Sequence, residues 1–201
     1  FVNDRRAAPR DDLISALVAA EEAEQLTTDE ILAIPILQLV AGNETTTNLI
    51  GNGTLALLER PEVAAQLRAN PSAIPAAVEE MLRFDSPVQA VVRIARESAV
   101  VGGKQIDQGD VLMMMLGAAN HDPEQFREPD RFEPARDPNR HLSFGMGPHF
   151  CLGAPLARLE AEVTFSALLA RYASIGRGEG EPERGGTLLL RGLTKLPLAV
   201  A

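Results

Sequence analysis

The most specific part of this 201-residue chain reads Phe144-Gly145-Met146-Gly147-Pro148-His149-Phe150-Cys151-Leu152-Gly153. It holds the only cysteine, and an apolar helical pattern begins directly after it. A single cysteine cannot form an internal disulfide or build a multi-cysteine metal site. A thiolate at a helix N-terminus is stabilised by the helix dipole and by unpaired backbone N–H groups. The pattern therefore predicts a nucleophile or a soft metal ligand at Cys151, the alternative being a small buried hydrophobe in a glycine-rich turn.

The composition indicates one domain or part of one, with enough residues for a sizeable core. The net charge of −9 argues against nucleic acid or an anionic membrane as a partner. One cysteine fits a reducing compartment, and the start carries no signal-peptide pattern. The longest apolar stretch, residues 31–41, is too short to span a bilayer. We expect a cytoplasmic protein and, because residue 1 is Phe rather than Met, part of a longer gene product.

The spacing of apolar residues predicts a mainly α-helical chain with small β-sheets. Thr27 and Glu30 fit a capping box before a long helix, in which Pro35 should cause a kink or mark a late start. Prolines are well placed to open two shorter helices. The predicted helices are 11–24, about 28–58, 61–69, 72–84 and 153–172.

Strand patterns concentrate after residue 87. Gly102-Gly103 is a hairpin signal between two of them. Residues 121–140, rich in Pro, Asp and Arg, are predicted to form an ordered meander, and a polar turn at 176–186 should precede a final pair of apolar strands. The predicted strands of the middle region are 91–94, 99–101, 104–106 and 111–114.

The long helix contains Ala41-Gly42-Asn43-Glu44-Thr45-Thr46-Thr47. A glycine inside a helix costs about 1 kcal/mol relative to alanine, and threonines weaken the same turn. Their hydroxyls can bond back to preceding carbonyls and bend the helix. A local weakness in a strong helix suggests a site. The alternative is a close helix crossing made by small residues, with Glu44 in solvent.

Glu80 and Arg83 stand three residues apart on a predicted helix, so both charges lie on one face. Such pairs are common on exposed helices. In combination with the other motifs, however, the chain resembles the cytochrome P-450 family. The cysteine segment resembles the haem-ligand loop Phe-x-x-Gly-x-x-x-Cys-x-Gly, residues 41–46 resemble the oxygen-binding helix motif, and Asp130-Arg131-Phe132 resembles the meander motif, in the family's order.

The resemblance covers essentially the whole chain but only the C-terminal half of a family member. It implies that residues 1–201 are the C-terminal portion of a single P-450 domain whose N-terminal half is absent. The implied parts are the long oxygen-binding helix, the Glu-x-x-Arg helix, the meander, the cysteine loop and the helix that follows it. Such a fragment alone should hold haem weakly and should not turn over.

The resemblance also implies roles for residues. Cys151 would be the axial thiolate ligand of the iron of haem b. Ala41 and Gly42 would leave room for dioxygen over the haem face, Thr45 would hydrogen-bond it, and Glu44 would help to relay protons. Arg93 and His149 would pair with the haem propionates, the alternatives being an edge-strand residue and a loop histidine. Further haem contacts would come from Ser143, Phe144, Gly145, Gly153 and Ala157.

A buried network of Glu80, Arg83 and Arg131 would support the haem loop rather than take part in catalysis. It would need every partner, because an orphaned buried charge costs several kcal/mol, on the order of 3–5.

The implied function is a haem-thiolate monooxygenase that activates dioxygen, its co-substrate, to hydroxylate or epoxidise a small apolar or natural-product-like organic molecule. No flavin or iron–sulfur domain is recognisable, so electrons should come from a ferredoxin or flavodoxin type donor. Arg136, Arg140 and Arg158 could steer such an acidic donor, or could instead pair with Asp130, Asp137 or Glu160. The alternatives are an inert P-450-like haem-binding or recruitment protein, a cysteine hydrolase using Cys151 with His149, and a zinc site.

Overall fold

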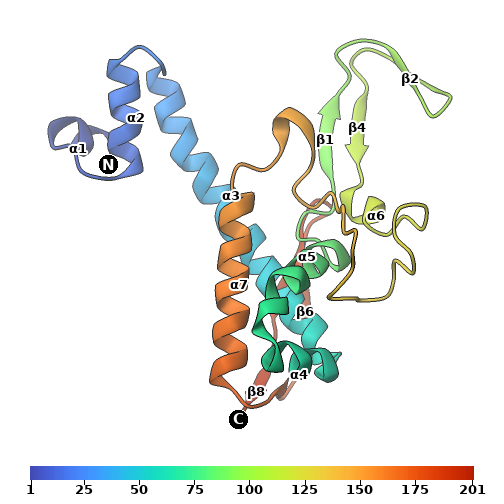
Figure 1. The fold of residues 1–201 in the computed structure, drawn as a ribbon. Coiled ribbons are helices and arrows are strands. Elements are labelled where there is room, and N and C mark those ends of the chain that lie inside the picture. The colour runs from blue at the N-terminus through green and yellow to red at the C-terminus, as the bar shows by residue number, and fades with distance from the viewer. The chain divides into compact units, whose positions relative to one another are not determined.

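The computed structural model describes residues 1–201, and their contacts divide the chain into two units, residues 1–44 and residues 45–201 (Figure 1). The first unit holds α1 (Val2–Ala7), α2 (Leu13–Glu22) and the first part of α3 (Thr28–Leu58). α2 starts where the Asp12 carboxylate accepts a hydrogen bond from the Ser15 N–H, a typical N-cap.

The long helix α3 begins at the predicted capping box. The Thr27 N–H donates to the Glu30 carboxylate at 2.8 Å, and the Glu30 N–H donates back to the Thr27 hydroxyl at 3.3 Å. α3 runs without interruption through Pro35 and through residues 41–47. The predicted late start at Pro35 is therefore wrong. Proline removes one N–H donor, and the capping box and many other turns still hold the helix together.

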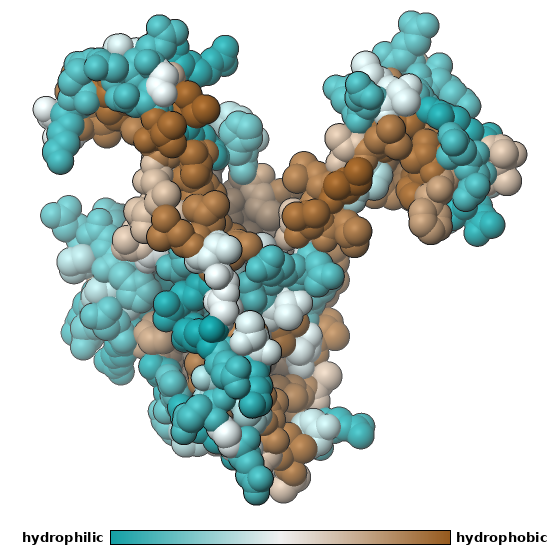
Figure 2. Space-filling view, turned by 180° about the vertical axis from the view of Figure 1, so that it is seen from behind, coloured by the Kyte–Doolittle hydropathy of each residue, from teal (hydrophilic) through white to brown (hydrophobic).

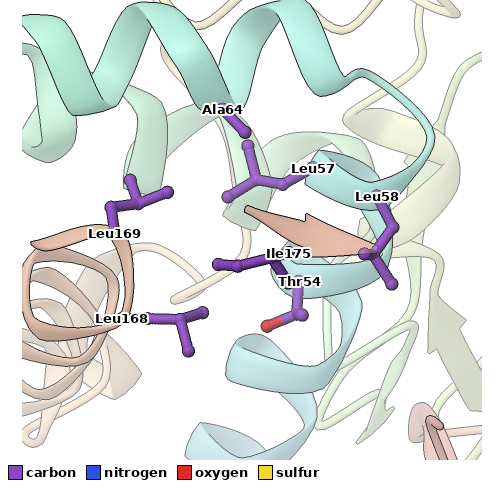
Figure 3. A pocket seen from close by; sticks show the side chains of 7 residues that line it. All are labelled: Thr54, Leu57, Leu58, Ala64, Leu168, Leu169 and Ile175. Atoms are coloured by element: carbon purple, nitrogen blue, oxygen red, sulfur yellow. The ribbon is translucent and has the colours of Figure 1, made fainter. Parts of the chain in front are cut away.

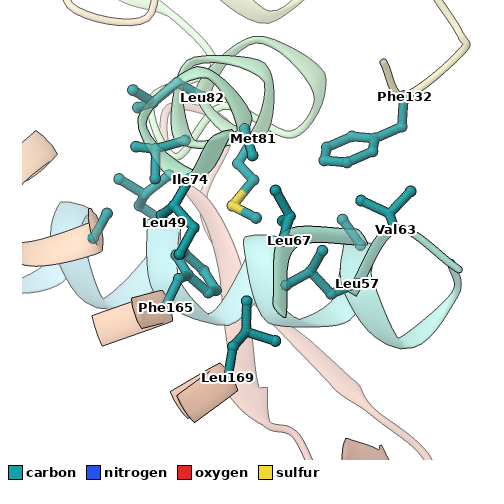
Figure 4. Packing of buried hydrophobic residues seen from close by; sticks show 14 residues of the cluster. Leu49, Leu57, Val63, Leu67, Ile74, Met81, Leu82, Phe132, Phe165 and Leu169 are labelled. Carbon is teal, nitrogen blue, oxygen red and sulfur yellow. The ribbon is translucent and has the colours of Figure 1, made fainter. Parts of the chain in front are cut away.

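The second unit is built on a helical core. α4 (Pro61–Ala69), a 3₁₀ turn (Pro71–Ala73), α5 (Ile74–Phe84) and α7 (Ala154–Arg171) surround the C-terminal part of α3. Figure 4 shows apolar side chains from these helices, together with Phe132 from the segment after α6, meeting in one cluster. The labelled core residues are Leu49, Leu57, Val63, Leu67, Ile74, Met81, Leu82, Phe132, Phe165 and Leu169.

Close helix contact requires glycine at one point of this core. A Cβ on Gly53 of α3 would lie only 2.7 Å from Met81 Sδ and from Phe165 Cζ. The packing leaves a cavity of about 10 Å³, shown in Figure 3, which has room for about one water molecule and not for a ligand. Its lining residues are Thr54, Leu57, Leu58, Ala64, Leu168, Leu169 and Ile175.

The strands of the middle region confirm the predicted ranges. β1 (Val91–Ile94) pairs antiparallel with β4 (Val111–Met114), and between them β2 (Ala99–Val101) pairs with β3 (Lys104–Ile106). Gly102 and Gly103 have φ of 57° and 76°, the left-handed conformation that a tight hairpin turn requires. Apolar side chains remain exposed along the β1–β4 pair, and the hydrophobic surface there is brown in Figure 2. The exposed residues are Val92, Ile94, Val111, Met113, Met114 and, just after β4, Met115.

The C-terminal region differs from the prediction. β5 (Ile175–Arg177) and β6 (Glu183–Gly186) occupy much of the stretch predicted as a polar turn. The last strands, β7 (Arg191–Lys195) and β8 (Leu198–Val200), do not pair with each other: β7 pairs with β6 and β8 with β5. A strand is formed by backbone hydrogen bonds and does not require apolar side chains, so the polar composition of residues 176–186 was not sufficient evidence for a turn.

The meander is confirmed, because residues 120–146 contain no regular helix or strand. It follows α6 (Leu116–Ala119), a single turn that the sequence pattern did not predict, and leads to a 3₁₀ turn at Gly147–His149. No helix is long and apolar enough to cross a lipid bilayer.

Candidate functional site

The cysteine loop lies between the meander and α7 and is shaped by its own backbone. The Cys151 N–H donates to the Phe144 carbonyl at 3.0 Å, which closes the loop. Gly145 and Gly147 have φ of 72° and 76°, a conformation in which glycine is favoured. α7 begins at Ala154, so the loop presents an exposed Cys151 thiol just before the N-terminus of that helix.

The residues around the thiol fit a large flat apolar ligand. Met146, Phe150 and Leu152 are 79%, 50% and 87% exposed. No group of three or more His, Cys, Asp or Glu residues is arranged to hold a metal ion. A metal bound to Cys151 would therefore bring most of its ligands with it, as the four nitrogens of a porphyrin do for iron. The donor set thus fits haem with one thiolate ligand and gives no support to the zinc alternative.

Four other residues predicted to contact haem lie in the cysteine loop or at the start of α7. Phe144 and Gly145 are half-buried in the loop, and a Cβ on Gly153 would lie 3.9 Å from Cys151 Sγ. The N–H of Ala157, in the first turn of α7, donates to the Gly153 carbonyl at 2.9 Å.

Ser143 has a supporting place instead. Its hydroxyl is buried, donates to the Leu82 carbonyl at 2.7 Å and accepts from the Asn120 amide at 2.9 Å. Both hydrogen bonds of the hydroxyl go to other parts of the chain. A contact of Ser143 with haem stays a prediction.

The buried ion pair of α5 anchors the meander. Glu80 and Arg83 are fully buried and form two hydrogen bonds of 2.8 Å. Arg83 also donates to the main-chain carbonyls of Asn120, Pro129 and Arg131, at 2.8, 2.8 and 3.1 Å. The Glu80 carboxylate accepts the Glu133 N–H at 2.8 Å. One charged pair thus satisfies several backbone groups of a segment that has no ladder of its own.

The third charged member of this network is Arg136, and the prediction of Arg131 is wrong. The Arg136 side chain is 5% exposed, and its Nε lies 3.3 Å from both Glu80 carboxylate oxygens. The Arg131 side chain is 64% exposed and lies near Glu128, and only the Arg131 carbonyl takes part in the network. The meander turns Arg131 outward while it brings its backbone to Arg83.

A second cluster, which the sequence reasoning missed, joins α5, the end of the meander and α7. Glu79 accepts two hydrogen bonds from Arg158, at 2.7 and 2.9 Å, and its other contact is His141 Nε2 at 3.1 Å. Burial raises the pKa of Glu79, but hydrogen bonds from His141 and Arg158 outweigh it and lower this pKa to about 2. The hydrogen bonds to Glu79 raise the pKa of Arg158. No motif spacing connects residues this far apart in the chain.

These contacts also correct the predicted basic cluster. Arg136 is buried, so it cannot form part of a surface for an electron donor. Arg158 pairs with Glu79 and not with Asp130, Asp137 or Glu160. Arg140 is exposed.

Two residues predicted at the haem edge are accessible. Arg93 is exposed on β1 opposite Leu112, and its guanidinium donates to the Val92 carbonyl at 2.8 Å. His149 is exposed at the end of the 3₁₀ turn, and no hydrogen bond joins its ring to the Cys151 thiol. A hydrolase pair of Cys151 and His149 therefore has no support in the contacts.

On α3, Ala41, Gly42 and Glu44 are exposed and Thr45 is half-buried. A Cβ on Gly42 would meet nothing within 4 Å. Packing within the chain therefore does not explain the glycine, in contrast to Gly53.

Comparison with known proteins shows which family the chain resembles in sequence and in fold. The Cytochrome P-450 family profile matches residues 2–191. The chain is 44% identical over 98% of its length to the 6-deoxyerythronolide B hydroxylase of Saccharopolyspora erythraea, and 44% identical over 98% to the biotin biosynthesis cytochrome P-450 of Bacillus subtilis. Its fold is similar, with a TM-score of 0.93 and 41% identity over 98% of the chain, to CYP109E1 from Bacillus megaterium in complex with testosterone, of which it covers 55%.

The family profile and the fold shared with solved structures define the class of protein, a family whose members are haem-thiolate proteins. The chain belongs to the cytochrome P-450 family. It spans about half the length of the curated relatives it matches, 50% in both cases named above.

Proposed function

We propose that this chain is the haem-binding part of a monooxygenase that uses dioxygen to oxidise a small organic substrate. The observation that carries the proposal is the exposed Cys151 just before α7, whose backbone N–H donates to the Phe144 carbonyl. When bound, haem would supply the oxidising chemistry, which a thiolate ligand favours by donating electron density to the iron.

The chain's own residues would bind and orient the group. Cys151 supplies the axial thiolate, and the exposed apolar side chains of Met146, Phe150 and Leu152 would cover apolar porphyrin surface. Arg93 and His149 are accessible donors, and each would pair with a haem propionate through a charge-assisted hydrogen bond.

The middle of α3 would handle the oxygen side of the reaction. Ala41 and Gly42 would leave room for dioxygen, and the open surroundings of Gly42, where a Cβ would meet nothing within 4 Å, support this role. The Thr45 hydroxyl would hold a proton donor in place, and Glu44 would deliver protons from solvent, since Glu44 is exposed.

The relatives support an apolar substrate. One is named for hydroxylation of 6-deoxyerythronolide B, and another was solved with testosterone. We extend this to a small apolar or natural-product-like molecule. A separate ferredoxin or flavodoxin type protein would supply the electrons, and the exposed Arg140 is the cation left free for its approach once Arg136 and Arg158 are paired with glutamates.

The experiment is a spectrum of the chain loaded with excess haem, reduced and exposed to carbon monoxide. The wild type should show the strongly red-shifted Soret band of a thiolate ligand. Cys151→Ala should abolish that band. In the matched variant His149→Ala the wavelength of the band should stay unchanged, although haem binding should be weaker. An unchanged band in Cys151→Ala would refute the ligand assignment. Product formation by the complete enzyme would then separate a monooxygenase from an inert haem protein.

A further inference from the structure

The cysteine loop touches the helical core through a cluster that is separate from the Glu80–Arg83 network. We infer that Glu79, His141 and Arg158, called here the loop clamp, position Phe144 and thereby the Cys151 peptide. This rests on the proposed function only where Cys151 is taken as the haem ligand.

The clamp joins parts that are far apart in sequence. Glu79 lies on α5, His141 lies near the end of the meander just before the cysteine loop, and Arg158 lies on α7. The Arg158–Glu79 contact is bidentate, so it fixes an angle as well as a distance. Their side chains are 32% and 30% exposed, which reduces screening by solvent without removing it.

His141 ties the loop backbone to the same carboxylate. Its side chain is only 3% exposed. The Ser143 N–H donates to His141 Nδ1 at 3.2 Å, so Nδ1 is the acceptor and Nε2 carries the hydrogen that is donated to Glu79. The clamp therefore holds one tautomer of His141 and, through it, the Ser143 amide just before the cysteine loop.

Arg158 completes the connection to the cysteine. Its guanidinium carbon lies 4.6 Å from the centre of the Phe144 ring, within cation–π range. Phe144 also contacts Phe150, whose ring centre is 6.2 Å from that of Phe144 at an interplanar angle of 60°. The Phe144 carbonyl accepts the Cys151 N–H. A displaced Phe144 would release that hydrogen bond, so the three clamp residues act on Cys151 through one intermediate residue.

Amide hydrogen exchange of the 201-residue chain tests the clamp without haem. Glu79→Gln and Arg158→Gln should each accelerate exchange of the Cys151 and Ser143 amides by roughly tenfold or more. The Glu133 amide, which is bonded to Glu80, should keep its wild-type rate. A merely global loss of stability would accelerate all three amides. Glu160→Gln, a change at an exposed position on α7 near Arg158, is the matched control and should alter the exchange rate of none of the three amides.

A milder variant guards against loss of folding. Arg158→Lys keeps the charge but lacks the planar fork that makes two hydrogen bonds and stacks on Phe144. It should still show faster exchange at Cys151, and wild-type exchange in Arg158→Lys would overturn the clamp.

The haem-loaded chain provides the second readout. Glu79→Gln should lower the fraction of the red-shifted carbon monoxide band, and an unaltered fraction would overturn the link from the clamp to the ligand. If the complete wild-type enzyme lacked this band, the proposed function would fail, while the exchange results would still decide whether the clamp exists.

Discussion

The Arg136 guanidinium lies against the fully buried Glu80 carboxylate, with Nε 3.3 Å from both of its oxygens, whereas the side chain of Arg131 points to solvent. Two arginines five residues apart in the same meander thus have opposite environments. The difference allows a direct test of which of them supports the fold.

Arg136→Gln should lower the free energy of unfolding by on the order of 3 kcal/mol, because Glu80 would lose one of its two buried cationic partners. Arg131→Gln should change it by less than about 0.5 kcal/mol, since an exposed ion pair contributes little. Urea unfolding of both variants measures the difference. Equal effects would contradict the arrangement of the network.

The variant Glu79→Gln should have a free energy of unfolding that depends less on pH in the acidic range. The pKa of Glu79 is lowered from 4.5 to about 2 in the folded chain, because the hydrogen bonds from His141 and Arg158 outweigh burial. A lowered folded-state pKa gives stability that is present above pH 4.5 and is lost as the pH falls through about 2. The gap in unfolding free energy between wild type and Glu79→Gln should therefore shrink from pH 5 towards pH 2. A constant gap would mean that the ionised carboxylate is not the stabilising form.

Two glycines of α3 should respond oppositely to alanine. Gly53→Ala should destabilise by about 1–3 kcal/mol, because its Cβ would press on Met81 and Phe165. Gly42→Ala meets nothing within 4 Å and should stabilise the helix by up to about 1 kcal/mol. Thermal unfolding measures both. If Gly42 serves dioxygen, the more stable variant should have the lower turnover in the complete enzyme, and unchanged turnover would remove that role.

Thr45→Ala in the complete enzyme should uncouple oxygen consumption from product formation. Without the hydroxyl, proton delivery would be poorly directed, and more of the oxygen consumed would appear as peroxide or water. The ratio of product to oxygen consumed is the measurement, with Thr47→Ala, an exposed neighbour on the same helix, as the control. Wild-type coupling in Thr45→Ala would place the proton path elsewhere.

Local features of the fold could be read from the sequence because each depends on neighbours in the chain. Pro61 predicted the first residue of α4, Gly102-Gly103 predicted the β2–β3 turn, and Thr27 with Glu30 predicted the start of α3. The cysteine loop belongs to the same kind of information, since glycine conformation and a helix start fix its shape within a few residues.

Tertiary packing decided the contacts between distant residues. The ion pair of Glu79 with Arg158 and that of Glu80 with Arg136 join residues 79 and 56 positions apart. Periodicity places a charge on a face of its own helix and carries no information about which distant cation will reach it. The choice of Arg136 over Arg131 follows from the path of a meander whose backbone is held by Arg83 and Glu80. The sequence by itself thus determined the longer helices, the central hairpins and the cysteine loop, whereas tertiary packing decided the pairing of the C-terminal strands and the partners of the buried charges.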